Sequence, residues 1–188
     1  EASVAEDSGD EHRPATLIWT SGSSSRPKAA LHSLFNHLQS ARGSGENLPL
    51  QAGDRWLLSL PVVHVAGVAI LSRCAVSGAT VVLPEAGKPF AEQFLQATPT
   101  HLSLVPPHLQ RLLQAGAEVV TALQDTKAIL LGGSAIPASL LREAENLGLV
   151  IYTSYGSTEM SSQITTTRSD STLEERLTSA GWSLPSRQ

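Results

Sequence analysis

Three short segments bring together hydroxyl groups, glycines and single charges of the kind that hold a polyphosphate. The first is TSGSSSRPK (Thr20–Lys28), which follows an apolar run and carries one glycine and one lysine. Backbone N–H groups and hydroxyls donate hydrogen bonds to phosphate oxygens, and an ammonium group supplies countercharge. A flexible serine-rich loop is the alternative. A Walker-type P-loop is excluded by the spacing, because Pro27 precedes Lys28 and Ala29 follows it.

Two further segments follow apolar runs later in the chain. In LGGSAIP (Leu131–Pro137) two glycines allow a ligand to approach the backbone closely. The alternative is a plain strand-to-helix turn that Ser134 caps. In YGSTEM (Tyr155–Met160) the ring could stack on a base, the hydroxyls could contact phosphate and Glu159 could bind Mg²⁺. A hard cation bound to phosphates needs only one or two protein carboxylates, although a capped turn would leave the same pattern.

Alternating apolar runs and helical patterns predict the elements that must position these segments. Strands are expected at Ala15–Thr20, Trp56–Leu60, Thr80–Leu83, His101–Val105, Lys127–Leu131 and Leu149–Thr153. Helices are expected at Leu31–Ala41, Gly67–Val76, Pro89–Ala97, Pro106–Ala115 and Pro137–Leu147. Gly43–Gly53 is predicted to be a loop, and the pattern weakens from Ser169 onward. This cadence predicts an α/β fold with a mostly parallel sheet flanked by helices, and in such sheets ligands bind at the carboxyl ends of the strands.

Length, composition and charge exclude several classes of protein. The 188 residues are 41% hydrophobic and 16% charged, which is enough for a sizeable core. The net charge of −4 disfavours nucleic acid as a partner, and the single cysteine, Cys74, excludes an internal disulfide and a multi-cysteine metal site. No apolar run reaches the roughly 18–20 residues that a membrane helix needs. We therefore expect a cytoplasmic protein without a membrane partner, whose acidic residues 1–14 form a flexible linker before an ordered part that begins at Ala15.

Taken together, the three segments resemble the motifs of the adenylate-forming acyl-CoA synthetases. The phosphate loop of that family reads roughly T-S-G-[ST]-T-G-x-P-K-G, and this chain has TSGSSSRPKA at Thr20–Ala29. The family's Y-G-x-T-E is YGSTE at Tyr155–Glu159. Three more segments are similar to the o-succinylbenzoate–CoA ligases of menaquinone biosynthesis, a group within the family: Trp56–Gly67, Leu102–Leu113 and Ala128–Pro137. The resemblance runs over residues 15–187.

The resemblance implies a reaction in two steps and a role for each matching residue. A carboxylic acid, such as o-succinylbenzoate, attacks the α-phosphate of Mg·ATP to give an acyl-adenylate and pyrophosphate. Coenzyme A then displaces AMP. The residues that would bind the nucleotide are Thr20, Ser21, Gly22, Ser23, Ser24, Ser25, Lys28, Gly133, Ser134, Ala135, Tyr155, Gly156, Ser157 and Thr158. Lys28, Thr158 and Glu159 would be catalytic, with Glu159 on the metal, and His64 and Ser134 would contact the acid. His32, His37, His101 and His108 are expected to be structural.

The chain also departs from the family's pattern. Ser25 stands where the family has glycine, which costs about 1–2 kcal/mol if φ is positive there, and Ala29 replaces the glycine after the lysine. The resemblance implies that residues 15–188 form the ATP-binding part of a large domain cut at both ends. The small C-terminal domain, which carries the lysine needed for adenylation, would lie beyond Gln188. We therefore expect the isolated chain to be inactive and able to form homo-oligomers through exposed strand edges.

Alternative functions are an aryl or fatty acyl–CoA ligase and a non-catalytic nucleotide-binding module. A serine hydrolase is disfavoured, because Gly132–Ile136 lacks the final glycine of a G-x-S-x-G elbow.

Overall fold

The main sheet is largely parallel. The computed structural model describes residues 9–20 and 28–185, and within them seven strands form one sheet in the order β4-β3-β5-β6-β7-β8-β9. These strands are β3 (Arg55–Leu57), β4 (Thr80–Val82), β5 (His101–Leu104), β6 (Ala128–Leu131), β7 (Ile151–Ser157), β8 (Ser162–Thr166) and β9 (Trp182–Ser183). The pairs from β4 to β7 are parallel, whereas β7-β8 and β8-β9 are antiparallel. The predicted α/β class and mostly parallel sheet are confirmed.

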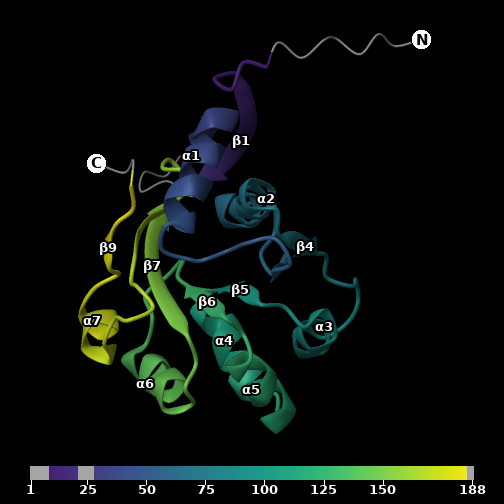
Figure 1. The fold of residues 1–188 in the computed structure, drawn as a ribbon, viewed down its shortest axis with the longest axis vertical. Helices are drawn as coiled ribbons and strands as arrows, with labels where there is room; N and C mark the ends of the chain where they lie inside the picture. Colours follow the sequence, from purple (N-terminus) through teal and green to yellow (C-terminus); the bar gives the residue numbers. More distant parts are fainter. Residues whose placement is uncertain (1–8, 21–27, 186–188) are drawn as a thin grey trace.

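Helices cover both faces of this sheet (Figure 1). They are α1 (Leu34–Gly45), α2 (Val65–Ser77), α3 (Phe90–Ala97), α4 (Pro106–Leu113), α5 (Ala117–Gln124), α6 (Ala138–Asn146) and α7 (Leu173–Thr178). Ile129 and Leu131 point into the core under α3 to α6, while Leu130 and Trp56 point into a second core under α2. Strands covered on both faces carry continuous apolar runs, which explains the AILL of β6. Among the described residues, every helix is too short or too polar to cross a lipid bilayer.

The segment after Pro27 differs from its prediction. Lys28–Ser33 form strand β2, which pairs antiparallel with β1 (Pro14–Thr20) as a separate hairpin. Ser33 is the N-cap of α1, since its Oγ accepts a hydrogen bond from Asn36 N and its N–H donates to Asn36 Oδ1. This reciprocal cap fixes the start of the helix at Leu34. The helix predicted from Leu31 was therefore wrong at that end, and α1 also extends into the predicted loop.

Two further predictions were incomplete. The strand expected to end at Thr153 continues as β7 to Ser157, because β8 pairs with this extension. The first three residues of the YGSTE motif are thus strand, and only Thr158 and Glu159 lie in the turn that leads to β8. Helix α5 was not predicted.

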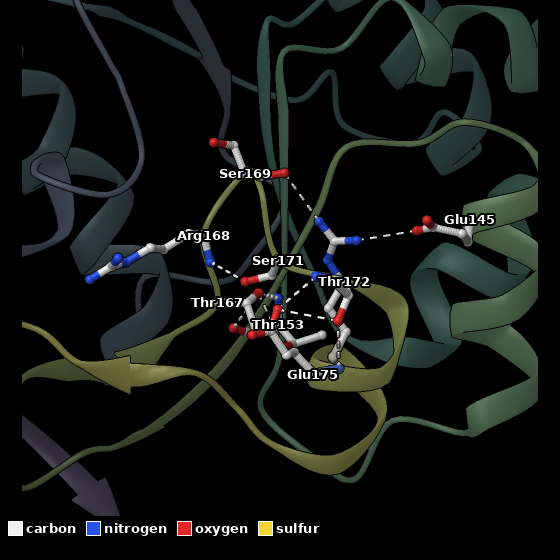
Figure 2. Close-up of polar contacts among 9 residues, drawn as sticks. Glu145, Thr153, Thr167, Arg168, Ser169, Ser171, Thr172 and Glu175 are labelled. Carbon is white, nitrogen blue, oxygen red and sulfur yellow. Dashed lines mark hydrogen bonds and ion pairs between the residues drawn. The ribbon is translucent and has the colours of Figure 1, made fainter.

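The C-terminal part of the chain is tied to the sheet domain by polar contacts (Figure 2). Thr172 caps α7 in the same reciprocal way as Ser33 caps α1, with Glu175 as its partner. Arg176 pairs with Glu145 of α6 at 3.2 Å and donates to the carbonyl of Ser169 at 3.4 Å. Helix α7 has only six residues, too few for a periodic pattern, which is why the sequence signal weakens there.

Candidate functional site

A pocket of about 380 Å³ lies at the carboxyl ends of the parallel strands. It is lined by Val105 after β5, by Gly132 and Gly133 after β6, and by Gly156 and Ser157 of β7. The loop before α2 closes another side with Leu60, Pro61 and His64. This edge is where open α/β sheets bind their ligands, so two of the three segments singled out in the sequence meet at one pocket.

The predicted site residues divide into three groups. His64, Gly133, Gly156, Ser157 and Thr158 line the pocket. Of the other residues that the structure describes, the following do not line it: Thr20, Lys28, Ser134, Ala135, Tyr155 and Glu159. Those outside the described residues are Ser21, Gly22, Ser23, Ser24 and Ser25.

Ser134, Ala135, Tyr155 and Glu159 lie within two positions along the chain of residues that line the pocket, whereas Thr20 and Lys28 lie on the β1–β2 hairpin. Thr20 and Lys28 face each other across the β1–β2 hairpin, where Lys28 is exposed. Ser134 and Ala135 are exposed in the segment between Gly133 and α6, and Ser134 does not cap that helix, since Pro137 is the N-cap. Tyr155 is 59% exposed.

Three glycines allow the strand ends to lie close together. A Cβ on Gly132 would lie 2.7 Å from the carbonyl oxygen of Ser154, and a Cβ on Gly156 would collide with the carbonyl oxygen of Ser162. Gly133 has a φ of +82°, a conformation that side chains disfavour. The glycines are therefore required by backbone packing as well as available for close approach by a ligand.

Arg73 was not among the predicted site residues, yet it lines the pocket from α2 while being only 4% exposed. Its Nε donates to Ser44 Oγ at 2.9 Å and its Nη2 to Gln163 Oε1 at 2.7 Å, and its guanidinium lies 5.4 Å from the centroid of Trp56. Burying a charged side chain costs free energy, which favours a functional role for Arg73. The signal in the sequence was a single charged residue, the arginine, inside a mostly apolar helix. The arginine gives the pocket wall a positive charge suited to an anion.

Two more lining residues hold polar atoms that lack partners. Ser103 Oγ and Gln163 Nε2 are buried and have no hydrogen-bond partner among the described residues. A buried polar atom without a partner costs about 1–3 kcal/mol. A polar ligand in the pocket could satisfy both atoms, which supports its assignment as a binding site.

The turn that carries Glu159 fits a magnesium ion held mainly by phosphates. Its carboxylate is exposed beside Thr158, which lines the pocket. In the part of the chain that the structure describes, no three histidine, cysteine or acidic side chains gather into a metal site. Mg²⁺ commonly uses one or two carboxylates together with substrate phosphates and water, so a single glutamate is a suitable donor set for that ion.

Known proteins share this architecture. The family model described as "AMP-binding enzyme" matches residues 2–188. The 2-succinylbenzoate–CoA ligase of Haemophilus influenzae is 39% identical over 170 residues, which are 90% of this chain and 37% of that relative. The chain spans about a third of the length of the curated relatives that it matches.

Solved structures agree with this match. The o-succinylbenzoate CoA synthetase of Bacillus subtilis in complex with its acyl-adenylate intermediate superposes with a TM-score of 0.81 at 34% identity, covering 94% of this chain and 36% of that one. The same enzyme in complex with ATP and magnesium ion gives a TM-score of 0.80 at 34% identity, covering 94% and 37%.

Proposed function

The chain belongs to the AMP-binding enzyme family, and from that premise we propose that residues 15–188 form the ATP-binding part of an AMP-forming acid–CoA ligase. A carboxylate oxygen of the acid attacks the α-phosphorus of ATP, the bond to pyrophosphate breaks, and an acyl-adenylate forms. The thiol of coenzyme A then attacks the acyl carbon and AMP leaves. The acid that we propose is o-succinylbenzoate.

One observation carries this proposal: a single strand-end pocket is lined by Gly133, Gly156, Thr158 and the buried Arg73. The glycines let a nucleotide approach the backbone closely. Thr158 would donate to the α-phosphate. Catalysis of this kind depends on positioning and on neutralising charge that develops in the transition state.

The other predicted site residues would hold the rest of the nucleotide. Tyr155 would stack on adenine, with Ser134 and Ala135 beside the junction of nucleotide and acid. Lys28 and the segment from Thr20 to Ser25 would bind the β- and γ-phosphates. Glu159 would hold Mg²⁺, which neutralises phosphate charge when it is bound.

The pocket also favours a particular kind of acid. Leu60, Leu104 and Val105 supply an apolar wall that suits an aromatic ring, while Arg73 suits a carboxylate other than the one that is activated. An aromatic acid with two carboxylates, such as o-succinylbenzoate, meets both demands. A long-chain fatty acid has no second carboxylate to accept a hydrogen bond from Arg73, and a charged hydrogen bond contributes about 1.5–3 kcal/mol.

Calorimetric titration tests this proposal. The chain, saturated with AMP, is titrated with o-succinylbenzoate and with 4-oxo-4-phenylbutanoate, which lacks the carboxylate on the ring. We expect o-succinylbenzoate to bind at least about tenfold more tightly, as one charged hydrogen bond predicts. The preference should persist in Arg73→Lys and disappear in Arg73→Gln, with circular dichroism confirming the fold of each variant. Equal binding of the two acids by the wild type, or tighter binding of a fatty acid, would contradict the assignment.

We also propose partners and an oligomeric state for the chain. The net charge of −4 and the match to enzymes of small molecules favour ATP, CoA and the acid as partners in the cytoplasm, without nucleic acid. The β1–β2 hairpin exposes Leu17, Trp19 and Leu31 on one face. Exposed apolar faces favour association, so homo-oligomers should be visible by light scattering at high concentration.

A further inference from the structure

Two buried histidines outside the pocket connect the β1–β2 hairpin to the turn that carries Thr158 and Glu159. His32 of β2 is 2% exposed and His37 of α1 is 3% exposed, and their ring centroids lie 5.3 Å apart. His32 Nε2 lies 2.6 Å from the carbonyl oxygen of Thr158, 126 residues later in the chain. His37 Nδ1 lies 3.1 Å from Ser161 Oγ, in the same turn.

Thr16 joins the two rings, and one set of protons satisfies every contact. A carbonyl only accepts, so His32 Nε2 must donate to Thr158 O. In a neutral His32 the other nitrogen accepts, which makes Thr16 Oγ1 the donor across 3.3 Å. His37 Nε2 then donates to Thr16 Oγ1 across 2.8 Å, and Ser161 Oγ donates to His37 Nδ1. With this arrangement the hydrogen bonds run in one direction, from Ser161 to Thr158.

The turn is anchored at both ends by these contacts. Thr158 O accepts from His32 at one end and also from Ser161 N, at 3.0 Å, within the turn. At the other end Ser40 Oγ of α1 donates to Ser161 O at 2.7 Å, in addition to the contact between Ser161 Oγ and His37. Glu159 lies between the two anchored residues. Its position along the turn therefore depends on β2 and α1.

Backbone conformation gives a second reason to regard these contacts as constraints. Ser161 has a φ of 57° and Ser162 a φ of 101°, in a region that residues with a side chain rarely adopt. Such conformations persist only where the surroundings determine them, and they cluster at functional sites. The contacts of His37 and Ser40 with Ser161 are the surroundings that hold this turn.

We propose that His32 and His37 are positioning residues that fix the Thr158–Ser161 turn relative to β2. Strand β2 begins at Lys28 and carries His32 four residues later. The histidines thereby set the separation between Lys28, on the phosphate side, and Glu159, on the metal side. The consequence for nucleotide binding rests on the proposed function, whereas the anchoring of the turn does not.

Variants of His32 separate positioning from general stability. His32→Leu removes the donor to Thr158 O, while His32→Gln keeps an N–H donor near the place of Nε2. His101→Leu is a matched control, because His101 is fully buried and its Nε2 also lies 2.9 Å from a backbone carbonyl, that of Pro49, away from the turn. All variants are compared without denaturant, at a temperature at which circular dichroism shows each to be folded.

Hydrogen–deuterium exchange without nucleotide tests the anchoring alone. We expect His32→Leu to accelerate exchange in peptides that cover residues 157–163 by about tenfold, as the loss of one buried hydrogen bond predicts. His32→Gln should restore most of the protection, and His101→Leu should leave these peptides unchanged. Unchanged exchange in His32→Leu, or equal acceleration in His101→Leu, would overturn the proposal.

Titration with Mg·ATP tests the consequence for binding. His32→Leu should weaken Mg·ATP binding by about tenfold, equivalent to about 1.4 kcal/mol, and should weaken ATP binding much less when Mg²⁺ is removed. His32→Gln should bind like the wild type. If His32→Leu binds Mg·ATP with wild-type affinity, the inference that His32 positions the nucleotide-binding residues is wrong. If the wild type itself does not bind Mg·ATP while the exchange result holds, the proposed function fails and the anchoring stands.

Discussion

At the scale of single residues, Gly156 shows how one atom decides the shape of the site. A Cβ at this position would collide with the carbonyl oxygen of Ser162, on the neighbouring strand β8. We therefore expect Gly156→Ala to displace β8 and to lower the free energy of unfolding by about 1–3 kcal/mol, as overpacking does. Urea denaturation measures this change.

The matched control is Gly45→Ala at the end of α1, where an added Cβ would meet no atom within 4 Å. Alanine is the better helix former, so this variant should be neutral or slightly stabilised. Equal destabilisation of both variants would show that the close contact between β7 and β8 is unimportant.

Because His37 is buried, the free energy of unfolding should depend on pH. Burial, with a smaller coulombic contribution from His32, lowers the pKa of His37. In the unfolded chain its pKa is about 6.5, so below that pH the unfolded state binds a proton that the folded state resists. Stability is therefore complete above about pH 6.5 and falls as the pH drops toward the pKa of the folded state.

Urea denaturation at pH 7.5, 6.5 and 5.5 checks this prediction. His37→Gln should be less sensitive to pH than the wild type, with the difference in slope reaching at most about 1.4 kcal/mol per pH unit. Because burial also lowers the pKa values of His101 and His108, some slope should remain. Parallel pH profiles for the two proteins would contradict this account of His37.

The residue types in the sequence predicted part of the candidate site. The rest depends on which faces are buried and on which distant residues meet in the fold. The glycines and hydroxyls of two segments could be predicted because they follow apolar runs that end at the same edge of a parallel sheet. Arg73 could not, because the sequence does not reveal which face of α2 meets the pocket. The link between His32 and Thr158 joins residues 126 positions apart, a separation that local patterns do not encode.

At the scale of elements, a side-chain cap decided where α1 begins. The apolar spacing from Leu31 to Ala41 continues across the end of β2, so periodicity alone placed the helix too early. The reciprocal hydrogen bonds of Ser33 and Asn36 set the observed start. The extension of β7 was missed for a related reason: Tyr155 and Ser157 become strand only because β8, which comes later in the chain, pairs with them.

The cap of α1 makes a prediction of its own. Ser33→Ala removes the oxygen that accepts from Asn36 N, and loss of such a cap typically costs about 1 kcal/mol. Ser139→Ala, at an exposed position of α6, should change stability by no more than about 0.5 kcal/mol. Thermal unfolding of both variants measures the difference. A cost for Ser33→Ala no larger than that for Ser139→Ala would refute the role of the cap.

At the scale of the whole molecule, the one cysteine reports on the integrity of the second core. Cys74 is 2% exposed, and burial raises the pKa of its thiol to about 11, against a smaller opposing effect of Arg73. Because the thiolate is the reactive form, Ellman's reagent should label the native chain at least about a hundredfold more slowly than the urea-unfolded chain, as a stable fold predicts. Labelling at similar rates in both states would mean that this core is open.

The alternation of strands and helices along the sequence predicted the parallel strands of the sheet, but it did not predict the antiparallel strands at its edge. Strands β3 to β7 are separated by helices, which is the pattern that predicts crossover connections. Strand β8 follows β7 after only four residues and β9 has just two residues, so neither leaves a clear apolar run. The family match covers both parts alike.

The most direct test of the central claim is a titration of the ¹⁵N-labelled chain with Mg·ATP, followed by nuclear magnetic resonance. We expect the amide signals of Gly133, Gly156 and Thr158 to shift together along one binding curve. The signals of Gly45 and Gly148, which do not line the pocket, should stay in place. If the three signals do not move, or if they follow separate curves, these strand ends do not bind one nucleotide and the proposed ligase site is contradicted.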